Sequence, residues 1–321
     1  MRLVIIIFLF SLSKSIAYAQ SVEIMDKERI SKNKISTQTL FEYDYVKGKP
    51  EKKGTKARVD SFDTQGNRVE QINYRASGSV HYIVTYKYDV SGNKTEYSKY
   101  SGDEKKLNYK QSIKFDSKGN KLMETGFNGI DSFKIVYNYY SKTGKLAEVN
   151  FFIQKKLDEK RVFKYTGNNA DLKVFDGSDN LKFTQKNVYS TSGKLLEETR
   201  YEIDNTISRK VVYTYDKNDN LTSETKYISS KMAGKITRVY NENELLLEVY
   251  QENTNGQKYL ANKYKYDDHN WLIEENSRSD AKQDFTKNVY SYDNNGICKT
   301  IDSYYSEYKK QVLSVFLYTN Y

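Results

Sequence analysis

Short runs of alternating apolar and polar residues fill most of the chain and end at small turn-forming residues. The runs 82–88 and 209–215 place an aromatic or β-branched residue at every second position just before such a turn. Because successive side chains of a strand point to opposite faces, this alternation is typical of strands that bury one face. Beyond the N-terminal leader we expect no helix, except a short turn near 25–31. The pattern predicts an all-β chain.

One turn motif recurs about every 26 residues along the chain. It consists of an aromatic residue, then Asp or another short polar residue, two variable residues, and then Gly, Asn or Asp. Phe62–Asn67 and Tyr88–Asn93 are clear copies. The copies begin at Phe62, Tyr88, Phe115, Tyr140, Tyr165, Tyr189, Tyr215, Tyr240, Tyr266 and Tyr292. Self-similarity at a fixed period indicates a repeat architecture.

The chemistry of two motif positions explains the repeat as a hairpin. The short polar side chain accepts a hydrogen bond from the backbone two residues on, and Gly, Asn or Asp tolerates the left-handed backbone that closes the turn. Asn169, Asp219 and Asn270 replace Gly in three copies, whereas Glu244 departs from the pattern and predicts a distorted turn. The structural turn residues are therefore Asp63, Gly66, Asp89, Gly92, Asp116, Gly119, Gly144, Gly193, Asp216, Asp267, Asp293 and Gly296. Each copy predicts one β-hairpin.

About ten tandem hairpins supply about twenty strands, more than a twisted open sheet usually holds without curling. A spiral of hairpins, a closed barrel and a long single-layer sheet are all compatible with this count. We predict a long antiparallel meander curled into a spiral or an open superhelical sheet. This repeat domain would cover residues 41–321 and follow a polar segment at 20–40.

The first 19 residues have the three parts of a secretory signal peptide. A basic start at Arg2 precedes the apolar run 3–10, and Ala17 and Ala19 frame a cleavage site before Gln20. We therefore expect an exported protein, in the periplasm, at the cell surface or secreted, without a transmembrane segment after cleavage. Export also argues against nucleic acid as a partner.

Composition assigns an unusual role to tyrosine. The chain has 31 Tyr but one Trp, one Pro and one Cys, and its mean hydropathy is −0.83. Tyrosine rings must then supply much of the buried surface, since a ring can be covered while its hydroxyl stays hydrated. The formal net charge of +10 could attract anionic glycans or other envelope components. However, lysines alternate with acidic residues, as on a solvated strand face.

The sequence offers little catalytic or metal-binding chemistry. His81 and His269 are far apart in sequence, and Cys298 follows a turn glycine as a small half-buried residue would. The segment 216–227 begins like a calcium loop but has Leu221 at the sixth position, where such a loop needs Gly. We expect no enzyme activity, no cofactor and no metal.

The motif resembles the YD repeat of the RHS (rearrangement hotspot) family, over roughly residues 40–321. The resemblance rests on units such as Tyr86-Lys87-Tyr88-Asp89-Val90-Ser91-Gly92-Asn93. It implies a spiral of hairpins and carbohydrate binding. In large members of the family such hairpins wind into a shell around a C-terminal toxin, for which this chain has no room after Tyr292.

We consider three functions for such a chain. The first is a binding or scaffolding protein of the bacterial envelope, with glycans, envelope polysaccharide or other envelope proteins as partners. Pairs of tyrosines two residues apart would form its binding face: Tyr86, Tyr88, Tyr213, Tyr215, Tyr264, Tyr266, Tyr290 and Tyr292. The second is an assembly component that pairs through sheet edges. The third is an outer-membrane barrel, suggested by the aromatic C-terminal run 315–321 but disfavoured by lysines within the strands.

Overall fold

The computed structural model describes residues 27–102 and 104–321 as one short helix and 23 strands. The expected signal peptide lies outside these residues. The helix is α1 (Lys27–Lys32), close to the turn expected near 25–31. The strands are β1 (Ile35–Val46), β2 (Lys49–Pro50), β3 (Thr55–Phe62), β4 (Arg68–Tyr74), β5 (Val80–Tyr88), β6 (Lys94–Ser101), β7 (Leu107–Phe115), β8 (Lys121–Phe127), β9 (Ser132–Tyr139), β10 (Leu146–Ile153), β11 (Lys156–Thr166), β12 (Asn169–Asp176), β13 (Leu181–Tyr189), β14 (Leu195–Tyr201), β15 (Ile207–Tyr215), β16 (Leu221–Ile228), β17 (Lys231–Tyr240), β18 (Leu246–Glu252), β19 (Lys258–Tyr266), β20 (Leu272–Ser277), β21 (Thr286–Tyr292), β22 (Cys298–Tyr305) and β23 (Lys310–Asn320).

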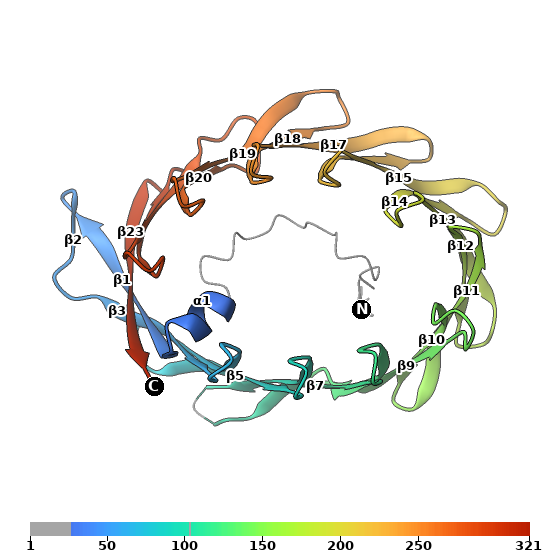
Figure 1. The fold of residues 1–321 in the computed structure, drawn as a ribbon, viewed down its shortest axis with the longest axis horizontal. Helices are drawn as coiled ribbons and strands as arrows, with labels where there is room; N and C mark the ends of the chain where they lie inside the picture. The colour runs from blue at the N-terminus through green and yellow to red at the C-terminus, as the bar shows by residue number, and fades with distance from the viewer. Residues whose placement is uncertain (1–26, 103) are drawn as a thin grey trace.

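The sheet closes into a barrel, which corrects the predicted open spiral. Each strand from β3 to β23 pairs antiparallel with the next, and β1 pairs with β3 on one side and with β23 on the other. The β1–β23 register runs from Ile35↔Asn320 to Asp44↔Val312, and it joins the first and last strands into a ring (Figure 1). The short β2 pairs with β1 outside this ring, so the barrel has 22 strands. Closure gives both terminal strands hydrogen-bond partners that an open sheet would leave unpaired.

The predicted hairpins and their side-chain-capped turns are confirmed. In the β5–β6 turn, Asp89 Oδ1 accepts hydrogen bonds from the backbone N–H groups of Ser91 and Asn93, each at 2.9 Å. Gly92 closes the turn with a φ of 80°. Because strand direction alternates, these motif turns gather at one end of the barrel, which we call the turn rim; the other connections form the loop rim.

Three turns differ in detail from the prediction. Glu244 takes the left-handed backbone (φ 61°) and donates its N–H to Asn241 O at 3.0 Å, so its turn is regular and the expected distortion is wrong. In the β11–β12 turn, Gly167 is left-handed while Asn169 already belongs to the strand. In the fourth unit β9 ends at Tyr139, one residue before the predicted start of the motif.

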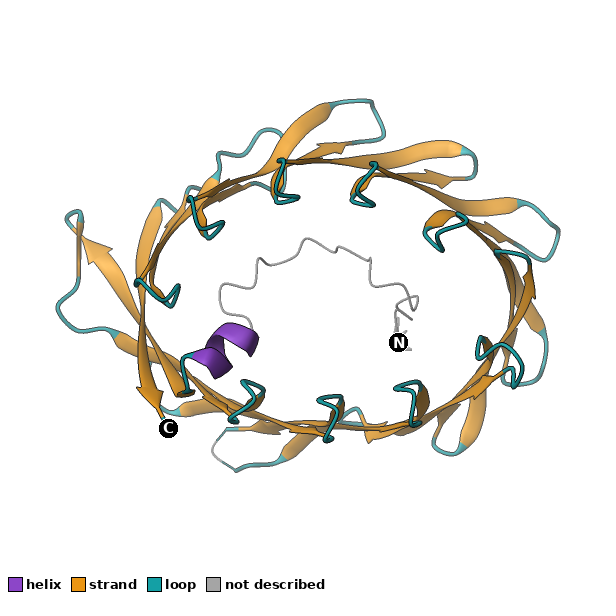
Figure 2. Cartoon of the chain, viewed as in Figure 1, coloured by secondary structure: helices purple, strands orange, loops and turns teal. Residues whose placement is uncertain are grey.

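Helix α1 identifies the inner wall of the barrel. It lies inside the ring in Figures 1 and 2, and its Ile30 is buried against Ile35, Phe62 and Ile297. Phe62 ends β3 on the face that also carries the motif aromatics of the other strands. That face is therefore the inner wall, and the alternate residues form the outer wall.

The core is a thin layer on this inner wall rather than a central mass. One cluster joins Ile135, Tyr137, Val149 and Phe151 across two strands. A second joins Val249, Tyr264, Leu272 and Tyr290 across β18 to β21. Barrels with this many strands are wider than their own side chains can fill, so each cluster stabilises only neighbouring hairpins.

Candidate functional site

The eight tyrosines predicted to bind a ligand all lie on the inner wall. Tyr264 and Tyr290 are 3% and 8% exposed, and the other six are half-buried. Alternation along β5, β15, β19 and β21 brings each pair to the same face, as the spacing of two predicted. Their role in binding stays a prediction.

Four of these tyrosines already use their hydroxyl groups within the wall. Tyr88, Tyr215, Tyr266 and Tyr292 each donate to a backbone carbonyl of the preceding unit, at Arg68, Leu195, Leu246 and Leu272, over 2.7–3.0 Å. Burial, together with the nearby Glu275 carboxylate, raises the pKa of Tyr266 to about 12. These hydroxyls bridge successive hairpins and are structural.

Sequence reasoning missed a row of rings that crosses the inner wall from β5 to β9. Tyr86 packs edge-on to Tyr97 at 5.6 Å between ring centroids, Tyr97 packs edge-on to Tyr109 at 5.5 Å, and Phe133 follows at 6.2 Å. Tyr97, Tyr109 and Gln111 line a shallow hollow there. These rings occupy different positions of successive units, so the motif does not reveal them; only the strand register aligns them.

Charged groups lie buried among the rings of the inner wall. Asp60, whose side chain is 1% exposed, contacts the Nε atoms of Arg58 and Arg68 at 2.8 and 3.0 Å. Burial raises the pKa of Asp60, although both guanidinium groups act to lower it. Glu124 accepts a hydrogen bond from the Tyr137 hydroxyl at 2.6 Å. These paired charges fix side chains and leave little free chemistry.

The most specific assembly on the inner wall is the contact between α1 and the seam where β1 joins β23. Arg29 Nη1 donates to Gly296 O at 2.9 Å in the β21–β22 turn, and its guanidinium carbon lies 5.8 Å from the Trp271 ring centroid. Ser31 Oγ donates to Thr64 O at 2.9 Å in the β3–β4 turn. The helix thus bridges turns that lie on opposite sides of the seam.

Two turn glycines make room for this assembly. A Cβ on Gly66 (φ 79°) would lie 2.1 Å from the backbone oxygen of Lys27, so a larger residue there would displace α1. A Cβ on Gly296 (φ 75°) would lie 2.7 Å from the Trp271 ring. Trp271 in turn stacks on His269 at 4.7 Å with an interplanar angle of 19°. The turn sequence therefore serves both the hairpin and the docking of α1.

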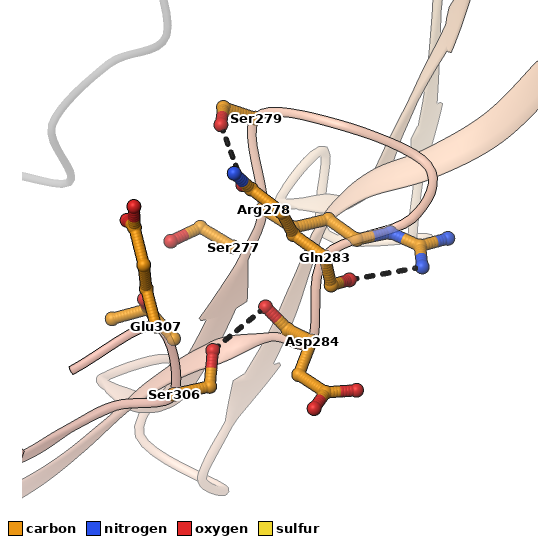
Figure 3. A pocket seen from close by; sticks show the side chains of 8 residues that line it. Ser277, Arg278, Ser279, Gln283, Asp284, Ser306 and Glu307 are labelled. Atoms are coloured by element: carbon orange, nitrogen blue, oxygen red, sulfur yellow. Dashed lines mark hydrogen bonds between the residues drawn. The ribbon is translucent and has the colours of Figure 1, made fainter. Parts of the chain in front are cut away.

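A pocket at the loop rim is built by the β20–β21 connection and the β22–β23 turn (Figure 3). Arg278 donates to Leu260 O at 2.8 Å and lies 4.7 Å from the Phe285 ring. Ser279 Oγ donates to Gln283 Oε1, and Ser306 Oγ donates to Asp284 O. The polar side chains that line this pocket are engaged in hydrogen bonds within the loops, as expected for a folded connection.

The residues with potential reactivity are not brought together. His81 is the second residue of β5, near the loop rim, whereas His269 lies in a turn at the turn rim. Cys298 is fully buried, and burial raises the pKa of its thiol to about 12. Within residues 27–102 and 104–321, His, Cys, Asp and Glu form no group of three that could hold a metal ion.

The outer wall carries ion pairs rather than an apolar band. Glu96 contacts the ammonium groups of Lys87 and Lys110 at 2.9 and 3.0 Å. Glu274 lies between Lys265 and Lys287 in the same way, at 2.9 and 3.0 Å. The glutamates recur with the repeat, at Glu70, Glu96, Glu148, Glu197, Glu248 and Glu274. None of the helical residues in the described part of the chain forms a segment long and apolar enough to cross a bilayer.

Comparison with known proteins identifies no family. No family model matches the chain, and no curated protein matches it. Among solved structures, "TcdB2-TccC3 without hypervariable C-terminal region" matches 80% of this chain, at 12% identity and a TM-score of 0.37. The chain spans only 14% of that protein's length. The resemblance to the YD repeat therefore stays a prediction.

Two further structures are of similar size to this chain. The match to a porin-like protein from Bacteroides uniformis covers 89% of this chain and 98% of that protein, at 10% identity and a TM-score of 0.32. The match to a porin-like protein from Bacteroides vulgatus covers 89% of this chain and 99% of that protein, at 9% identity and a TM-score of 0.25. Both TM-scores are too low to carry an argument about function. The closed barrel by itself fits the outer-membrane alternative better than the open scaffold, and no match supports carbohydrate binding.

Proposed function

We propose that this chain is an exported, non-enzymatic barrel of the cell envelope that holds a polypeptide segment against its inner wall. The contact between α1 and the seam carries this proposal. Ile30 fills an apolar site, Arg29 pairs with a carbonyl and an aromatic ring, and Ser31 binds a second turn. An apolar anchor flanked by specific polar contacts is the usual anatomy of a peptide-binding site.

The chemistry of the two walls supports an interior role. The inner wall offers half-buried tyrosines and a row of edge-packed rings, which can cover apolar side chains and accept hydrogen bonds. The outer wall offers Lys–Glu–Lys pairs, which are stable in water. Each lysine or arginine at the midplane of a bilayer would cost about 2–4 kcal/mol. We therefore propose that the outer wall faces water.

An outer-membrane barrel is the second candidate, because the sheet closes with an even number of antiparallel strands, 22. Aromatic residues also recur where the second strand of a hairpin approaches the loop rim, as at Tyr74, Tyr100, Phe127, Phe152, Tyr201, Tyr227 and Tyr304. Alternation places them on the outer wall. The two candidates differ in the surroundings of the outer-wall ion pairs, which are water in the first candidate and lipid in the second.

Solubility separates the two candidates. The full chain is expressed with its expected leader, and the protein is sought in the soluble fraction and in the membrane fraction before and after detergent extraction. A folded monomer in the soluble fraction supports the water-facing barrel. Two results together would contradict it. The protein would be recovered only from detergent extracts, and the membrane would protect the lysines of the outer-wall ion pairs from an amine-reactive reagent.

The sole tryptophan provides a direct test of peptide holding, because Arg29 lies over the Trp271 ring. In the double variant Arg29→Ala, Ile30→Asp, we expect α1 to be released and the Trp271 emission to shift to longer wavelength. A synthetic peptide of residues 27–34 should then restore the emission in a saturable titration. A peptide with Ile30→Asp is the control. Unchanged emission in the variant, or equal titration by both peptides, would contradict the proposal.

A further inference from the structure

A hairpin beside the seam projects from the barrel and forms a basic surface with exposed apolar groups. β1 and β2 pair through Tyr45↔Pro50 and Val46↔Lys49, and the turn between them has Lys47 and Gly48 at positive φ. The hairpin lies outside the ring in Figure 1. We call residues 45–54 the seam finger. A two-residue turn of this type makes a tight and defined tip.

The charge of the seam finger is concentrated and exposed. The segment contains one acidic residue, Glu51. Its four lysines are all exposed: Lys47, Lys49, Lys52 and Lys53. The outer wall differs, because there each lysine described above contacts a glutamate. The finger therefore presents uncompensated positive charge at the loop rim.

Exposed apolar side chains accompany these lysines. Val46 at the tip is 53% exposed, and Tyr308 in the adjacent β22–β23 turn is 73% exposed. Lys310, at the start of β23, contacts Asp44 at 2.9 Å and so holds the two connections together. At the base of the finger, the Tyr45 hydroxyl donates to Asp302 at 3.0 Å. The surface is thus both amphipathic and fixed in position.

We propose that the seam finger and the β22–β23 turn bind the surface of an anionic lipid membrane. Lysine ammonium groups would meet phosphate headgroups, while Val46 and the Tyr308 ring enter the boundary between headgroups and acyl chains. The charge complementarity selects anionic lipid over neutral lipid. The exposed valine and tyrosine select a lipid surface over a soluble polyanion, which has no apolar layer to receive them. The site is independent of α1 and of the inner wall.

Vesicle binding tests this proposal with the full mature chain. We expect co-sedimentation with vesicles of phosphatidylglycerol and phosphatidylcholine, and much weaker binding to phosphatidylcholine alone. The triple variant Lys47→Glu, Lys49→Glu, Lys52→Glu should weaken the partition coefficient at least about fivefold per lysine. Val46→Asp should weaken it as well, without changing the thermal unfolding temperature.

Matched controls exist at the opposite rim. The triple variant Lys118→Glu, Lys142→Glu, Lys217→Glu changes three exposed turn lysines, and Val90→Asp changes a fully exposed valine. Both should bind vesicles within about twofold of the wild type. Equal losses in finger and control variants would overturn the proposal, as would absence of anionic-vesicle binding by the wild type. A soluble sulfated polymer could also compete with the vesicles. If it competes equally well in the wild type and in Val46→Asp, the surface is a polyanion site, and the proposal is overturned. Unchanged Trp271 emission confirms that each variant is folded.

Discussion

The Tyr266 hydroxyl donates a hydrogen bond to the backbone carbonyl of Leu246, 2.9 Å away and 20 residues earlier in the chain. The same link recurs at Tyr88, Tyr215 and Tyr292, and also in units outside the predicted pairs, at Tyr240 and Tyr318. Each link joins the end of a hairpin's first strand to the start of the preceding hairpin's second strand. The motif tyrosine therefore acts as a tie between units, besides covering the sheet.

Tyr266→Phe should lower the free energy of unfolding by about 1 kcal/mol, because it leaves a half-buried carbonyl without its donor. Urea denaturation measures the change. Tyr97→Phe is the matched control, since the Tyr97 hydroxyl makes no hydrogen bond to any of the described residues. We expect the control to remain within about 0.5 kcal/mol of the wild type. Equal effects of the two substitutions would show that the hydroxyl tie is not stabilising.

Asp89→Ala should destabilise the barrel by about 1 kcal/mol, because the backbone N–H groups of Ser91 and Asn93 lose their acceptor. Asp89→Asn should cost much less, since an amide oxygen can accept the same bonds, as Asn241 does at the equivalent position. Thermal unfolding of the two variants checks this order. A larger loss in the Asn variant than in the Ala variant would contradict the turn mechanism.

Gly296→Ala should destabilise the chain more than Gly193→Ala. Both glycines have positive φ, 75° and 82°, so both substitutions strain the backbone equally. Only at Gly296 would the new Cβ meet the Trp271 ring, whereas the space beside Gly193 is open. We expect an additional loss of at least about 1 kcal/mol and a changed Trp271 emission. Equal unfolding midpoints would show that the ring moves without cost.

Acid should weaken the outer-wall ion pairs. Partial burial alone would raise the pKa of Glu274, but hydrogen bonds from Asn276, Lys265 and Lys287 lower it to about 2. Because this folded-state pKa lies below the usual value near 4.3, the stabilisation is complete above about pH 5 and is lost as the pH falls toward 2.

Glu274→Gln should therefore cost about 1 kcal/mol at neutral pH, a value reduced by solvent screening, and almost nothing near pH 2. Denaturation midpoints across this pH range measure the difference. Glu242→Gln, in an exposed turn, is the control and should leave the pH profile unchanged. A constant difference between Glu274→Gln and wild type from neutral pH to pH 2 would show that the ion pairs do not contribute.

The hairpins could be predicted because their determinants are local. A side-chain oxygen such as that of Asp89 and a left-handed residue such as Gly92 define a turn within five residues, whatever the rest of the chain does. The alternation in Tyr86 and Tyr88 likewise fixes a shared face. Local reasoning was less accurate where a residue type was unusual: Glu244 adopts the left-handed backbone without distorting its turn.

The sequence by itself determined the strands, the turn chemistry and the face that carries the tyrosines. Only the tertiary structure decided that the sheet closes, since closure depends on the sum of small twists over all strands and on the pairing of β1 with β23, more than 260 residues apart. The same closure made one face an interior, brought Arg29 of α1 to Trp271, and placed the seam finger outside the ring. None of these contacts is encoded in a single repeat, because each joins segments whose spacing in sequence has no relation to the period.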